Sequence, residues 1–129
     1  EVLWITRMQA GKEWVWISGN HDPSPKNLGG SFLQSLKIEK LNFQHIANAE
    51  KCCEISGHYH PKIKVKLQGQ SFTKHCFLVD ENRVIMPAYG TYTGGLYCNS
   101  EPLRSIMQKK AIALMTGKKV YPIPISKAY

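Results

Sequence analysis

Short apolar or alternating runs, each bounded by turn residues, limit this chain to a β-rich fold. The sequence Lys-Ile-Lys-Val-Lys-Leu at 62–67 alternates polar and apolar side chains, which is typical of a strand with one buried face. Helical patterns are confined to 2–10 and 101–109. Further strands are expected at 14–17, 32–36, 41–45, 53–56, 76–79, 84–86, 111–115 and 120–125, the last four as two hairpins. Because the chain has 129 residues and no internal repeats, we expect one domain spanning 1–129.

The charge balance favours polyanionic partners. Seventeen Lys and Arg residues against nine Asp and Glu give a net charge of +8, which attracts nucleic acid and phosphate esters. Lys62, Lys64 and Lys66 lie on one strand face, and we interpret them first as a solvated edge that discourages aggregation and second as a nucleic-acid patch. No apolar run approaches the roughly 20 residues of a membrane span, so no membrane partner is expected.

The four cysteines indicate a reducing compartment. Cys52, Cys53, Cys76 and Cys98 show no C-x-x-C spacing, and no signal-peptide pattern opens the sequence. Buried or free thiols are therefore expected, and with them a cytoplasmic location.

Two short polar segments, each opened by a glycine, contain three of the five histidines: Gly-Asn-His-Asp at 19–22 and Gly-His-Tyr-His at 57–60. Asparagine oxygen and neutral imidazole nitrogen are ligands for the divalent transition metals that hydrolyse phosphate esters. Each glycine allows a tight turn, and each segment follows a predicted strand. In α/β sheets ligands bind beyond the carboxyl ends of strands. The two segments together predict most of one metal site.

Four side chains are the predicted metal ligands. Asn20 offers a neutral oxygen, and His45 stands at the end of the predicted strand 41–45. His58 and His60 are two residues apart, so in an extended backbone they would project to the same side and reach neighbouring metals.

Two further residues of the first segment are the predicted catalytic pair. Hydrolysis of a phosphate ester needs a proton for the leaving oxygen as well as an activated water. His21 follows the ligand Asn20 and is therefore held near the metal, where it can act as a general acid. Asp22 can orient its imidazole and stabilise the charged form.

The two segments, with the lone His45 between them, closely resemble two signature blocks of the calcineurin-like metallophosphoesterases. The stretches 14–23, 57–61 and 86–95 resemble one bacterial subgroup, the ligase-associated DNA-damage-response phosphoesterases, which are regarded as endonucleases in DNA repair. The resemblance implies two divalent metals, Mn, Zn, Fe or Ni, in a complete site. It implies that Asn20, His45 and His58 bind the second metal and His60 the first. It further implies that His21 donates a proton or stabilises the transition state, with support from Asp22.

The family's first blocks, an Asp-x-His and a Gly-Asp, have no counterpart in residues 1–18, whose only acidic residues are Glu1 and Glu13. They include the carboxylate that bridges the two metals, so one metal or none is expected here. The fold implied is α/β: the carboxyl-terminal portion of an α/β/β/α metallophosphoesterase sandwich, mostly β-strands, without the amino-terminal βαβ region.

Two functions remain open for such a truncated domain. One is a metal-dependent phosphoesterase that hydrolyses phosphodiesters or phosphomonoesters, including nucleic acid, and is impaired by the missing ligands. The other is a catalytically silent remnant that acts as a basic binding module. In both cases the loss of strands would expose a sheet edge, which predicts self-association.

Overall fold

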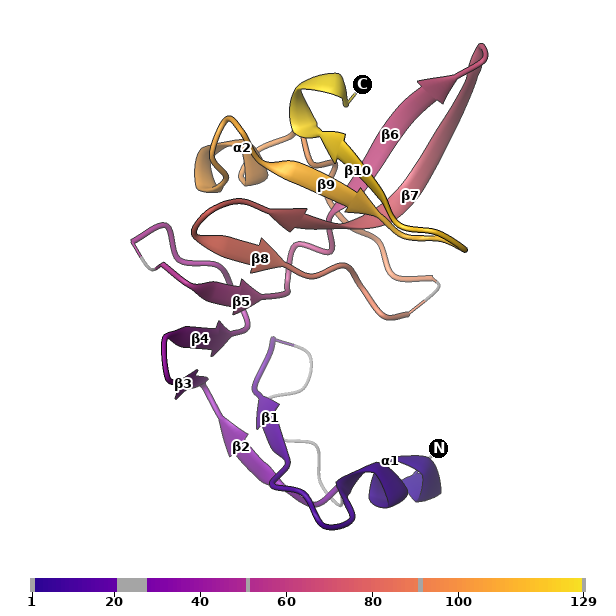
Figure 1. Cartoon of the computed structure of the whole chain (residues 1–129). Helices are drawn as coiled ribbons and strands as arrows, with labels where there is room; N and C mark the ends of the chain where they lie inside the picture. The colour runs from indigo at the N-terminus through magenta and orange to yellow at the C-terminus, as the bar shows by residue number, and fades with distance from the viewer. Residues whose placement is uncertain (1, 21–27, 51, 91, 129) are drawn as a thin grey trace.

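Strands make up most of the regular structure in the computed structural model, which describes residues 2–20, 28–50, 52–90 and 92–128 (Figure 1). The helices are short: α1 (Val2–Gln9), α2 (Leu103–Ile106) and the 3₁₀ helix η1 (Ile125–Lys127). The strands are β1 (Val15–Ile17), β2 (Ser31–Leu33), β3 (Ser35–Ile38), β4 (Leu41–Gln44), β5 (Glu54–Ser56), β6 (Lys62–Leu67), β7 (Gln70–Val79), β8 (Arg83–Ile85), β9 (Ile112–Met115) and β10 (Tyr121–Pro124). The expectation of a mostly β fold with few helices is confirmed.

The main sheet is mixed, with the order β10-β9-β7-β8-β5-β4-β3. Its centre is parallel, because β4 pairs with β5 and β5 with β8 in the same direction, whereas the pairs toward both edges are antiparallel. The carboxyl ends of β4, β5 and β8 consequently meet at one edge of the sheet. Ligands bind at such an edge in open sheets, and the loops after these strands carry the candidate site.

A second, smaller sheet is formed by β1 and β2, which pair in parallel from Val15 opposite Ser31 to Ile17 opposite Leu33. Only Gln34 separates β2 from β3. The prediction of one strand over 32–36 is therefore wrong, because the chain leaves one sheet and enters another within it. Figure 1 shows α1, β1 and β2 beyond the β3 edge of the main sheet.

A long hairpin of β6 and β7 projects from the main sheet (Figure 1). Gln68 and Gly69 both have positive φ, 49° and 80°, as a two-residue type I′ turn requires. Residues 70–75 of β7 pair with β6, and its remaining residues pair with β8 and β9. The predicted strand 62–67 is confirmed, whereas 76–79 covers only the buried half of β7.

The core lies between the main sheet, the base of the hairpin and α2. Its fully buried apolar side chains are Ile63, Cys76, Leu78, Ile85, Cys98, Leu103 and Ala113. By contrast, α1 exposes Leu3 and Trp4, which are 66% and 59% accessible. Within the described ranges no helix combines the length and the apolar character needed to cross a bilayer.

Candidate functional site

Two imidazoles meet at the edge formed by the carboxyl ends of the parallel strands. His45 directly follows β4, and His58 lies two residues beyond β5. The Nε2 atom of His45 and the Nδ1 atom of His58 are 3.1 Å apart, and the ring centroids lie 4.9 Å apart at 73°. A backbone hydrogen bond of 3.0 Å from Gly57 N to His45 O ties the two loops together. Strand order therefore brings residues 13 positions apart into direct contact.

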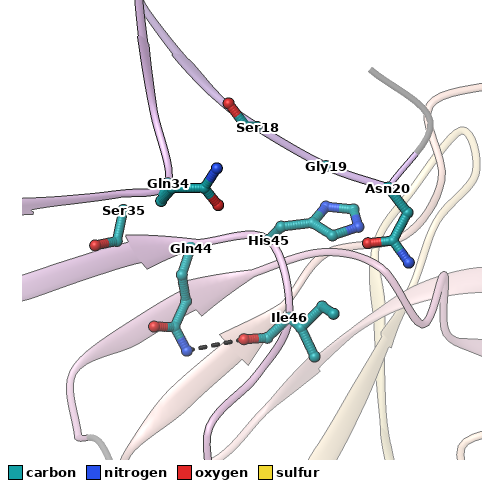
Figure 2. Close-up of a pocket in the computed structure, with 8 residues that line it drawn as sticks. All are labelled: Ser18, Gly19, Asn20, Gln34, Ser35, Gln44, His45 and Ile46. Atoms are coloured by element: carbon teal, nitrogen blue, oxygen red, sulfur yellow. Dashed lines mark hydrogen bonds between the residues drawn. The ribbon is translucent and has the colours of Figure 1, made fainter. Parts of the chain in front are cut away.

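The first glycine segment packs on the same ring. A Cβ atom on Gly19 would lie 2.8 Å from Cε1 and 2.9 Å from Nδ1 of His45, so only glycine allows this close approach. Asn20 follows, and Figure 2 shows its side chain beside the His45 ring, in a pocket of about 340 Å³ that both residues line. The hydrogen bond from Ser18 N to Leu33 O, 2.8 Å long, fixes this segment to the end of β2.

His60 lies in a turn with an unusual backbone conformation. His58 and His60 both adopt left-handed conformations, with φ of 62° and 47°, so the expectation that they lie in an extended backbone is wrong. The turn is closed by Tyr59 N donating to Gly57 O at 2.7 Å. Left-handed non-glycine residues carry strain of order 1 kcal/mol and gather at functional sites. His60 lines a second pocket, of about 430 Å³, together with His45 and His58.

The loop after β8 presses directly on His60. A Cβ atom on Gly95 would collide with the carbonyl oxygen of His60 and lie 3.0 Å from its Cβ. Leu96 N donates to Tyr59 O at 3.0 Å, and Lys62 N donates to Leu96 O at 2.9 Å. The third parallel strand thus supplies the wall that holds the 57–60 turn.

A buried carboxylate positions the segment around His45. Glu54 is 1% accessible, and its Oε2 atom accepts hydrogen bonds of 2.8 Å from Gln44 Nε2 and from Asn48 N. Its register partner on β8, Arg83, is also buried and donates to the carbonyls of Asn48 and Ala49. Sequence reasoning did not identify this network, although an acidic residue between the apolar neighbours Cys53 and Ile55 of a predicted strand is a signal for it.

The predicted ligands are therefore distributed over two adjoining pockets that share His45. Asn20 lies with His45 in the first, and His58 and His60 lie with it in the second. Among the described residues, no group of three or more His, Cys, Asp or Glu side chains is arranged to hold a metal ion. The predicted catalytic pair, His21 and Asp22, lies outside the described residues. The roles of all six residues stay predictions.

The cysteines divide into two exposed and two buried thiols. Cys52 and Cys53 are exposed, whereas Cys76 and Cys98 are completely buried. Burial raises the pKa of Cys76 to about 12, helped by the neighbouring Cys98, and burial raises the pKa of Cys98 to about 11. Such thiols are inert at neutral pH.

Comparison with solved structures finds a protein of similar fold. No protein-family model matches the sequence, and no curated protein matches it. Among solved structures, the chain is similar to Pseudomonas putida nuclease MPE, with a TM-score of 0.63 and 24% sequence identity. The match covers 93% of this chain and 58% of that protein, so this chain spans less than two thirds of its length. At this identity the likeness establishes a shared fold.

Proposed function

We propose that this chain carries part of the active site of a metal-dependent phosphodiesterase that acts on nucleic acid. The observation that carries the proposal is the 3.1 Å approach of two imidazole nitrogens, from His45 and His58, at the carboxyl ends of parallel strands. The fold shared with a nuclease and the net charge of +8 point in the same direction. We further propose that the chain forms the carboxyl-terminal part of an α/β/β/α sandwich and that it acts in the cytoplasm.

The two imidazole nitrogens fit a transition metal. Ligand nitrogens bind Zn²⁺ at 2.0–2.1 Å, so two neighbouring ligands of one ion stand about 2.9–3.4 Å apart for right-angled to tetrahedral geometry. The observed 3.1 Å, at which the two nitrogens are also hydrogen-bonded to each other, lies inside that interval. His45 and His58 would hold the ion, with Asn20 and His60 as the further ligands on either side. When bound, Zn²⁺ or Mn²⁺ polarises a phosphoryl oxygen and lowers the pKa of a bound water.

The protein groups would orient the ligands and move the proton. Gly19 packs on the ring of His45, and the Glu54 network fixes the backbone on the other side of that residue. Both contacts set the direction of the ring nitrogens. His21, next to Asn20 in the sequence, would protonate the leaving oxygen, and Asp22 would stabilise its charged imidazole.

A second candidate is a basic binding module without catalysis. It is favoured by the absence, among the described residues, of any group of three His, Cys, Asp or Glu side chains that could hold a metal.

We also propose self-association through the exposed apolar side chains of α1, Leu3 and Trp4. Size-exclusion chromatography over a range of concentrations tests it, and a strict monomer at the highest concentration contradicts it.

Turnover of a small chromogenic phosphodiester separates the two candidates. The protein is stripped with a chelator and assayed with Mn²⁺, Zn²⁺ or Ni²⁺. The phosphodiesterase proposal predicts metal-dependent turnover that His58→Ala lowers by at least about 100-fold, because a lost ligand removes both charge stabilisation and the activated water. His75→Ala, a histidine of β7 outside both pockets, is the matched control. Turnover that is absent, or that His58→Ala leaves intact, favours the binding module.

A further inference from the structure

We propose that the lysine row of β6, formed by Lys62, Lys64 and Lys66, binds the phosphate backbone of an unpaired nucleic-acid strand as it leaves the His45–His58 site. The inference rests on the proposed function, because it names the form of the substrate and the surface that receives it. It is carried by the geometry of the projecting hairpin.

The three lysines form a single row on one face of β6. Side chains alternate along a strand, and Ile63 and Val65 on the other face pack into or against the core, so the lysine face points away from it. Lys64 and Lys66 are exposed, and Lys62 is half-buried at the base. At about 3.3–3.4 Å per residue, successive lysines stand about 6.7 Å apart. Opposite Lys64 and Lys66, β7 presents Thr73 and Ser71, which donate hydrogen bonds without adding negative charge.

The hairpin concentrates the positive charge of the molecule. Residues 62–75 contain four lysines and no acidic residue, and no acidic residue occurs anywhere between Glu54 and Asp80. The hairpin therefore contains no carboxylate that could form an ion pair with its own lysines. A row of unneutralised cations on an extended arm attracts a polyanion.

The row begins at the candidate metal pocket. Lys62 lies two residues after His60, and Pro61 between them is fully buried, which fixes the direction in which β6 leaves the pocket. Lys62 Nζ lies 5.0 Å from the ring centroid of Tyr97, which neighbours the pocket residue Leu96 and is 39% exposed. The Lys62 ammonium lies over one face of this partly exposed ring, so an aromatic side chain and the lysine row, the two kinds of group that single-strand sites combine, adjoin at the base of the hairpin.

The shape of the surface favours one strand rather than a duplex. The row lies on β6 alone, so the surface offers a single line of positive charge. A duplex, by contrast, presents two phosphate backbones across a groove. The competing interpretation is that the lysines protect the open side of β6 from edge-to-edge aggregation, since beyond the bridge of Lys62 to Tyr97 the described residues pair this strand with β7 alone. That role requires charge on the edge but no affinity for nucleic acid.

Fluorescence anisotropy with a labelled oligothymidine of about 15 nucleotides, in chelator, tests the surface separately from catalysis. Each phosphate contact on a single strand contributes about 0.7 to the slope of log K against log salt. The triple variant K62Q/K64Q/K66Q is therefore expected to lower the slope by about 2 and to weaken binding about 100-fold at 0.1 M salt. The triple K62R/K64R/K66R, which keeps the charge, is expected to bind within about threefold of the unchanged protein.

The matched control removes the same charge elsewhere. Lys40, Lys109 and Lys110 are exposed outside the hairpin, and K40Q/K109Q/K110Q is expected to change the affinity by less than about fivefold. An equal loss in this control, no binding by the unchanged protein, or tighter binding of a duplex of the same length overturns the inference. Lysine-dependent binding without phosphodiester turnover contradicts the proposed catalysis alone. Turnover without lysine-dependent binding contradicts this surface alone.

Discussion

Replacing Gly95 by alanine should damage the candidate site through the backbone that supports it. The added Cβ would collide with the carbonyl oxygen of His60 and stand 3.0 Å from the carbonyl carbon of that residue. The obstructing atoms are backbone, so they cannot swing aside as the end of a flexible side chain would. The loop after β8 and the 57–60 turn must move apart.

The expected magnitude follows from the bonds that join the two segments. The contacts Leu96 N to Tyr59 O at 3.0 Å and Lys62 N to Leu96 O at 2.9 Å lie immediately beside the collision. Overpacking costs about 1–3 kcal/mol, and a weakened backbone hydrogen bond adds about 1 kcal/mol. The free energy of unfolding should therefore fall by about 2–4 kcal/mol, equivalent to about 10 °C in Tm for a domain of this size.

Urea unfolding of two adjacent alanine variants measures this effect. Gly94 has open space around its Cβ position and no positive φ, so Gly94→Ala should be neutral or slightly stabilising, by up to about 1 kcal/mol. The contrast between neighbouring positions removes any general effect of glycine replacement in the loop. If Gly95→Ala unfolds within about 0.5 kcal/mol of Gly94→Ala, the close packing of this loop on His60 is refuted.

Two further predictions concern buried polar groups. Glu54→Gln should lower the free energy of unfolding by about 1–3 kcal/mol, because an amide cannot accept all the hydrogen bonds that end on the carboxylate. Urea unfolding at neutral pH measures this change, and an unchanged free energy of unfolding would contradict the hydrogen-bond network. Raised pKa values of about 12 for Cys76 and about 11 for Cys98 mean that the folded chain retains protons that the unfolded chain, with thiol pKa 9.0, releases. Their contribution is full below pH 9 and is lost as the pH rises toward 12, so stability should fall over that interval. If a Cys76→Ala/Cys98→Ala variant loses stability just as steeply between pH 9 and 12, the two thiols do not cause the pH dependence.

The strands were largely predictable because their patterns are local. Alternation at 62–67 defines β6 to the residue, and the β-branched and aromatic run at 14–17 locates β1 within one residue. The split between β2 and β3 at Gln34 was missed because residues 31–38 contain no Gly, Pro, Asn or Asp that would mark the change of sheet. The length of β7 was missed for a related reason: its outer half is exposed on both sides of the projecting hairpin and shows no burial pattern.

For the candidate site, sequence motifs proposed the residues but could not give their geometry. The glycine segments indicated loops at strand ends, and the parallel pairing of β4 with β5 places His45 beside His58. The left-handed backbone at His58 and His60 was not predictable, because it depends on the loop of Gly95, about 35 positions away in the sequence. Long-range packing of this kind has no local signature.

Calorimetric titration of the purified protein with Zn²⁺ measures whether His45 and His58 converge to bind one metal ion. We expect saturable binding that His45→Ala and His58→Ala each weaken at least about tenfold, since even indirect supports of a metal ligand contribute about 10–100-fold. The affinity of His75→Ala should equal that of the unchanged protein. Affinity that is equal in all four proteins would contradict this convergence.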